Sequence, residues 1–151
     1  MIKEKKSALM KATDLLANQD QSSTVLRRKL LARKYDSAEV DDAIAKLKKY
    51  NYLDDDETCR RQFENFYTDE KLSVRQIAAK LVQRGFDKDF IERLIPDDAE
   101  EHDQLVAAKL LSKKFPNAAK FDKAKAWQFL SSRGFNGDVI SSAIEKLLID
   151  N

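Results

Sequence analysis

The sequence contains few residues that interrupt helices, and no long apolar run. Only 3 glycines and 2 prolines occur among 151 residues, so tight β-turns are rare and long helices are favoured. The single cysteine, Cys59, excludes an intrachain disulfide framework and fits a reducing compartment. No apolar run approaches the roughly 18–20 residues of a membrane span, and the N-terminus lacks a signal-peptide core. We therefore expect a cytoplasmic protein that makes no contact with a membrane.

The sequence also lacks a pattern typical of a catalytic, metal or cofactor site. The only histidine, His102, lies between Glu101 and Asp103 and has no cysteine nearby, whereas a metal site needs three or four converging ligands. Cys59 falls on an apolar stripe, which favours a buried structural thiol over a nucleophile. There is no glycine-rich phosphate loop, and most carboxylates stand at helix starts, where capping explains them. We expect no enzyme, no cofactor and no metal.

One stretch, residues 74–95, predicts two short helices joined by a tight turn. Ser73 and Gln76 form a capping-box pattern before the first helix, and Gly85 marks the corner between the two helices. The stretch occurs three times in phase, at a period of about fifty residues that indicates stacked helical units. The corresponding corners are Arg33-Lys34-Tyr35, Arg84-Gly85-Phe86 and Arg133-Gly134-Phe135; the corresponding core positions include Leu30, Leu81 and Leu130, then Val40, Ile91 and Ile140.

Each repeat adds one further helix before this hairpin, so the sequence predicts nine helices and no strand. The expected fold is all-α, with three tandem three-helix, helix-turn-helix-like repeats at residues 1–50, 51–96 and 97–151. The first helix is expected over residues 3–18, and Asp36 with Glu39 predicts a capping box at the third. The acidic runs from Asp54 and from Asp97 suit the positive ends of the helices that follow them.

Two alternatives remain open for the corner of the first repeat, where Lys34 takes the place of glycine. Lys34 can adopt the left-handed conformation at a cost of roughly 1 kcal/mol relative to glycine. The turn can instead have a different geometry in this repeat.

Basic residues concentrate on the middle helix of each repeat, while the third helices begin with acidic residues. A helix-turn-helix protein that reads DNA directly would bring those acidic starts toward phosphates, which argues against it. The basic helices can contact a phosphate backbone or an acidic protein groove, although a solvated surface also explains each charge taken singly. The candidate partner-binding residues are Arg27, Arg28, Arg33, Arg75, Lys80, Arg84, Lys123, Lys125 and Arg133.

The sequence resembles the RecX family of bacterial proteins that regulate the RecA recombinase. The resemblance rests on the three helical units, the Tyr52-Leu53-Asp54-Asp55 signature and the Arg-Gly-aromatic corners, and it covers about residues 8–148. Two departures are Lys34 and Asn51, each in place of a glycine. Asn51 tolerates a left-handed backbone, so the turn is expected to survive.

This resemblance implies an elongated, curved and monomeric array that binds RecA and the RecA–DNA filament. It further implies inhibition of recombinase, ATPase and coprotease activities. From their phase in the repeat, we hypothesise that part of the contact is made by Arg27, Arg28, Arg75, Arg84 and Arg133. Weak direct binding to DNA can accompany this activity. One rival is a stand-alone DNA-binding protein that contacts the phosphate backbone and binds DNA tightly without RecA. Another is a helical scaffold for an unrelated partner. A helical enzyme would need a pocket of perturbed ionisable groups, which the sequence does not indicate.

Overall fold

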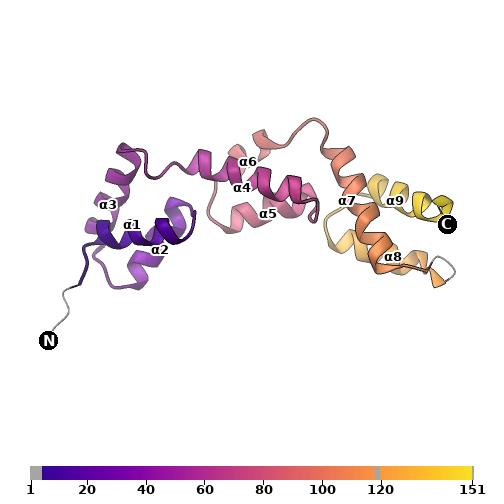
Figure 1. Ribbon diagram of the computed structural model, residues 1–151, viewed down its shortest axis with the longest axis horizontal. Helices are drawn as coiled ribbons and strands as arrows, with labels where there is room; N and C mark the ends of the chain where they lie inside the picture. The colour runs from indigo at the N-terminus through magenta and orange to yellow at the C-terminus, as the bar shows by residue number, and fades with distance from the viewer. Residues whose placement is uncertain (1–4, 118–119, 151) are drawn as a thin grey trace.

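The computed structural model describes residues 5–117 and 120–150, and this part of the chain is all-helical (Figure 1). The all-α prediction is therefore confirmed over the described residues, which contain nine α-helices and no strand. In chain order they are α1 (Ala8–Asn18), α2 (Ser23–Ala32), α3 (Ser37–Lys49), α4 (Asp55–Asp69), α5 (Val74–Gln83), α6 (Lys88–Leu94), α7 (Ala99–Lys114), α8 (Lys123–Ser132) and α9 (Gly137–Asp150).

The helices pack in consecutive groups of three, and each group has its own apolar core. Leu26 and Leu30 of α2 lie in the first core, which also takes in Leu53 just before α4. Ile77 and Leu81 of α5 lie in the second core, and the third core forms among α7, α8 and α9. The groups follow one another along an elongated array (Figure 1), as expected of units that bury apolar surface chiefly within themselves and against their neighbours.

The corners predicted from the repeat adopt the backbone conformation that they require. Gly85 and Gly134 have φ angles of 89° and 85°, and Lys34 has a φ of 70° at the equivalent place in the first unit. Lys34 is therefore left-handed, which settles the alternative that the sequence left open. Asn51 is left-handed too, with a φ of 62°. The predicted capping box at Ser73 and Gln76 is also present.

Two predictions about helix starts are wrong. Residues 5–7 are not helical, and α1 begins at Ala8 because Ser7 caps it by accepting from the amide of Met10; residues 3 and 4 lie outside the described part. Asp36 precedes α3 without a side-chain capping bond. The Glu39 carboxylate instead accepts the partly buried amide of Ala8 at 2.9 Å, because that first-turn N–H has no partner inside its own helix.

No helix within the described ranges is both long enough and apolar enough to cross a lipid bilayer.

Candidate partner-binding surface

The middle helices α2, α5 and α8 are joined end to end by a repeated hydrogen bond. The hydroxyl of Ser22, at the start of α2, donates to the main-chain oxygen of Arg84 at the end of α5, at 2.6 Å. The hydroxyl of Ser73, at the start of α5, donates in the same way to Arg133 at the end of α8, at 2.7 Å. The positive N-terminus of α2 thus meets the negative C-terminus of α5, and the N-terminus of α5 meets the C-terminus of α8.

A second repeated bond ties each middle helix to the first helix of the next unit. Asp55 of α4 accepts from the backbone amide of Ser23 at 2.7 Å and also from its hydroxyl. Asp103 of α7 accepts from the backbone amide of Val74 at 3.0 Å. Asp54 caps α4 as predicted, by accepting from Glu57. Asp55 and Asp103, however, accept hydrogen bonds from first-turn N–H groups in the helix of the preceding unit.

The corner glycines leave space for this docking. A Cβ atom on Gly85 would lie 2.9 Å from the Ser22 hydroxyl oxygen and 2.9 Å from Cβ of Thr24. One on Gly134 would lie 3.1 Å from the Ser73 hydroxyl oxygen. In the first unit Lys34 is exposed. The carbonyl of the neighbouring corner arginine there accepts from the flexible Lys5 ammonium at 3.0 Å instead of from a helix start, so the glycine is not required for space.

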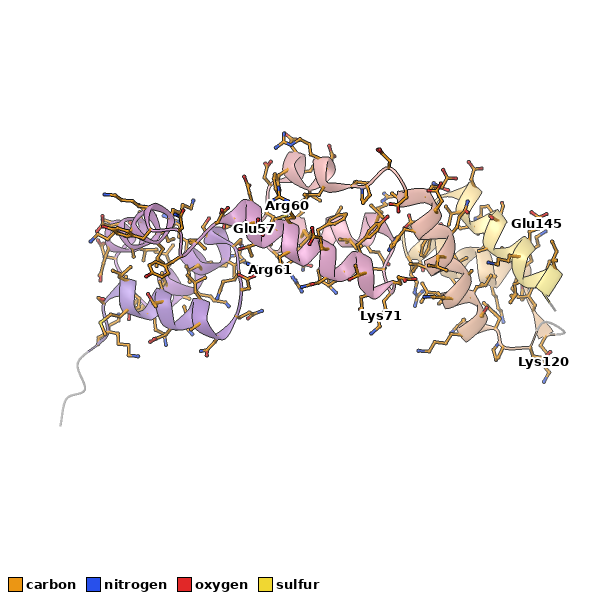
Figure 2. All side chains as sticks on the ribbon, turned by 45° about the horizontal axis from the view of Figure 1, so that its top comes forward. Glu57, Arg60, Arg61, Lys71, Lys120 and Glu145 are labelled. Carbon is orange, nitrogen blue, oxygen red and sulfur yellow. The ribbon has the colours of Figure 1, made fainter. Side chains whose placement is uncertain are left out.

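Further contacts fix both junctions. At the first, Arg61 of α4, which is labelled in Figure 2, pairs with Asp20 at 2.7 Å. At the second, the Tyr67 and His102 rings stack with centroids 4.0 Å apart, and His102 Nε2 donates to the Tyr67 carbonyl at 3.0 Å. The Tyr67 hydroxyl donates to Asp98 at 2.6 Å; burial and this carboxylate raise the pKa of Tyr67 well above its usual value. His102 therefore packs as a structural residue.

The predicted partner-binding residues lie on these three joined helices and at their C-terminal corners. Each of the three helices has 10 residues and is therefore about 15 Å long. Arg133 is half-buried and the other eight side chains are exposed. We call these nine residues the basic row: Arg27, Arg28, Arg33, Arg75, Lys80, Arg84, Lys123, Lys125 and Arg133.

Two corners of the basic row hold a pair of cations over one aromatic ring. Arg84 lies 4.9 Å and Lys80 5.4 Å from the ring centroid of Phe66. At the next corner, Arg133 lies 3.9 Å and Lys114 5.7 Å from the ring centroid of Phe129. The rings hold the cations by cation–π attraction, and none of these four cations has an ion pair with a described carboxylate.

The first unit differs. Arg27 pairs with Asp41 of α3 at 2.7 Å, so its charge is partly offset. The Arg33 guanidinium donates to the carbonyl of Lys29 at 3.2 Å. Arg28, in contrast, has no ion pair within the described ranges, and the same holds for Arg75, Lys123 and Lys125 of the later units. The structure thus places all nine predicted residues on the three joined helices or at their corners but surrounds them differently.

Sequence reasoning missed Lys114 and the role of the two rings. Phe66 packs against the second core and is half-buried, and its ring also lies under Lys80 and Arg84. The spacing of Phe129 and Arg133, four residues apart on one helix, is the signal that was available.

The described residues include no group of three or more histidine, cysteine, aspartate or glutamate side chains placed to hold a metal ion. Cys59 is buried in the second core. Its pKa is raised to about 11, chiefly by burial and then by the nearby carboxylates of Asp56 and Asp55.

Comparison with known proteins identifies the family. The regulatory protein RecX of Thermus thermophilus is 33% identical over 128 residues, which cover 85% of this chain and 83% of that protein. The chain belongs to the RecX family. RecX of Neisseria meningitidis serogroup A is 29% identical over 154 residues, covering 99% and 97% of the two chains. Residues 101–144 match the family model described as the third three-helix domain of RecX.

Solved RecX structures share the fold. The crystal structure of RecX from Lactobacillus salivarius superposes with a TM-score of 0.74 at 19% identity, covering 94% of this chain and 95% of that one. A second crystal structure, of a regulatory protein RecX, gives a TM-score of 0.77 at 20% identity, with coverage of 92% and 72%. The expected fold class of tandem three-helix repeats in an elongated curved array is confirmed. The relatives are named regulatory proteins, so the chain is a member of a family of regulatory proteins.

Proposed function

We propose that this protein binds RecA and the RecA–DNA filament and inhibits recombinase, ATPase and coprotease activities. The observation that carries the proposal is the basic row, which lies on three helices joined by a repeated hydrogen bond in a RecX-family array. A filament presents the same surface again and again, so charges repeated along a rigid line can contact successive copies of it.

The corner clusters of the basic row supply the strongest candidate contacts. Lys80 with Arg84, and Lys114 with Arg133, each place two cations over one ring without an ion pair to a described carboxylate. Such cations are already positioned, so less side-chain entropy is lost when they meet phosphates or carboxylates. Arg28 and Arg75 belong to the same basic row and are further candidate contacts. Arg27, in contrast, would have to break or share its ion pair with Asp41 in order to bind a partner.

The experiment is a titration of the DNA-dependent ATPase of preformed RecA filaments with this protein. A fall in rate at amounts well below that of RecA supports capping of growing filament ends. A fall only near equal amounts supports binding along the filament groove. Unchanged ATPase at every ratio contradicts the proposal and favours a scaffold for an unrelated partner.

A second candidate is stand-alone DNA binding through the basic row. The paired cations of the Phe66 and Phe129 corners favour it, because two adjacent cations suit a phosphate backbone. This reading requires tight binding to DNA in the absence of RecA, weakening steeply as salt rises. Binding to DNA alone, measured by fluorescence anisotropy at several salt concentrations, separates the two candidates.

The proposal implies that the protein acts as a monomer in the cytoplasm, together with its partner. The single buried thiol fits that reducing compartment.

A further inference from the structure

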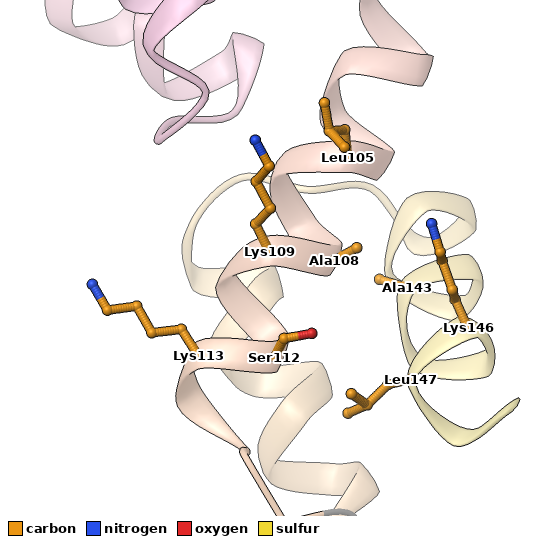
Figure 3. A pocket seen from close by; sticks show the side chains of 8 residues that line it. All are labelled: Leu105, Ala108, Lys109, Ser112, Lys113, Ala143, Lys146 and Leu147. Atoms are coloured by element: carbon orange, nitrogen blue, oxygen red, sulfur yellow. The ribbon is translucent and has the colours of Figure 1, made fainter. Parts of the chain in front are cut away.

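A groove between α7 and α9, separate from the basic row, has the features of a peptide-binding site (Figure 3). It encloses about 570 Å³, and all of its lining residues come from these two helices. Small side chains form much of its floor, with Ala108 and Ser112 on α7 facing Ala143 on α9 (Figure 3). Leu147 of α9 also lines the groove and extends toward α7 (Figure 3), so the walls consist of small or apolar side chains.

One end of the groove offers an apolar anchor point. Leu105 stands at that end with 44% of its surface exposed. A leucine or phenylalanine of a partner would bury apolar area against it and against the alanines of the floor. No aromatic residue lines the groove, so it lacks the stacking surface by which proteins hold the bases of single-stranded nucleic acid.

The rim of the groove is positively charged. Lys109 and Lys113 extend from α7 on the side turned away from α9, Lys146 extends from α9 (Figure 3), and no acidic residue lines the groove. Lys109 already holds a carboxylate, since it pairs with Glu70 of the preceding unit at 2.7 Å. Lys113 and Lys146 form no ion pair with any described residue, so two rim ammonium groups are available.

From this combination of apolar floor and basic rim, we propose that the α7–α9 groove binds an acidic amphipathic segment of a partner protein. The apolar side chains of that segment enter the channel beside Leu105. Its carboxylates pair with Lys113 and Lys146. This contact does not use the basic row, so it gives the array a second, independent attachment point.

The test uses the full chain and a fluorescein-labelled synthetic peptide, with leucine at every third or fourth position and glutamate elsewhere. Binding is followed by fluorescence anisotropy. A peptide of the same composition with its leucines scattered around the helix reports binding by charge alone. Ser112→Glu places a carboxylate in the groove floor on α7. The control Ser141→Glu places one at an exposed position of α9 that lies outside the groove.

We expect the amphipathic peptide to bind at least roughly tenfold more tightly than the scrambled one. Ser112→Glu, and separately Lys113→Glu with Lys146→Glu, should weaken that binding roughly tenfold or more, while Ser141→Glu leaves it unchanged. Equal binding of the two peptides, or no loss in the groove variants, overturns the proposal. The proposal is also overturned if single-stranded DNA displaces the peptide. The same holds if the protein self-associates and Ser112→Glu abolishes that self-association.

Discussion

The hydroxyl of Ser73 donates a hydrogen bond of 2.7 Å to the main-chain oxygen of Arg133, which lies 60 residues further along the chain. Ser73 also caps its own helix by accepting from the amide of Gln76. One side chain thus starts α5 and fixes the end of α8. Because Ser22 and Arg84 repeat the arrangement, the same small contact sets the spacing of both junctions.

The double role of Ser73 predicts a large cost for its removal. Ser73→Ala removes the cap and the contact between units, so the free energy of unfolding should fall by about 1–3 kcal/mol. Urea denaturation followed by circular dichroism measures this. Ser37→Ala is the control, because Ser37 is an exposed serine in the first turn of α3. Equal losses in the two variants would mean that Ser73 acts as an ordinary surface serine.

Gly85 should tolerate no side chain. Gly85→Ala introduces a Cβ 2.9 Å from Ser22 and Thr24 at a φ of 89°, so both crowding and the left-handed backbone lower the free energy of unfolding, by roughly 1–3 kcal/mol together. Gly137→Ala is the matched control, because its new Cβ would meet only the Trp127 ring, at an ordinary 3.7 Å. A thermal melt in which Gly137→Ala loses as much as Gly85→Ala would rule out this explanation.

Replacing Lys34 with glycine should not lower the stability of the protein. Lys34→Gly relieves a left-handed lysine at φ 70°, so the free energy of unfolding should stay level or rise by up to about 1 kcal/mol. Lys48→Gly, at an exposed position within α3, should instead cost about 1 kcal/mol. A clear loss of stability in Lys34→Gly would show that the lysine side chain makes a contact that stabilises this corner.

The buried thiol of Cys59 predicts a specific dependence of stability on pH. Its pKa is raised from 9.0 to about 11 in the fold, so between these values the unfolded chain has lost a proton that the folded chain keeps. Unfolding is therefore favoured progressively as pH rises from about 9 to about 11. The urea concentration at the unfolding midpoint should therefore decrease more between pH 8 and pH 10.5 in the wild type than in Cys59→Ala. An equal decrease in both proteins would mean that groups other than Cys59 cause the loss of stability at high pH.

The helices and corners could be predicted from sequence because they depend on neighbouring residues. The apolar spacing around Leu81 and Leu130, the Ser73–Gln76 capping box and the glycine corners are all local signals, and the structure has them. For the corner at Lys34 the sequence left two backbone conformations open, since the conformation of a non-glycine corner depends on what packs there.

The junctions could not be predicted in the same way. Asp55 and Asp103 look like acidic starts of their own helices, and nothing local shows that they accept amides of the preceding unit. Glu39 likewise fits a capping box by spacing but bonds to Ala8, 31 residues earlier. The cation pairs over Phe66 and Phe129 depend on packing between turns and helices. The sequence therefore identifies basic residues as candidates but does not show which of them lie over an aromatic ring.

The central claim, that the basic row mediates inhibition of RecA, is tested by a single comparison of ATPase rates on preformed RecA–DNA filaments. The wild type is compared with a variant in which five arginines of the row are changed to glutamate: Arg27, Arg28, Arg75, Arg84 and Arg133. The control variant carries five such changes at cations outside the row: Lys48, Lys71, Lys88, Arg93 and Lys120.

Circular dichroism first establishes that both variants remain folded. We expect wild type and control to lower the ATPase rate alike, and the row variant to lose most of that effect, because its carboxylates repel phosphates and acidic surfaces. Inhibition by the row variant equal to that of the wild type would contradict the account.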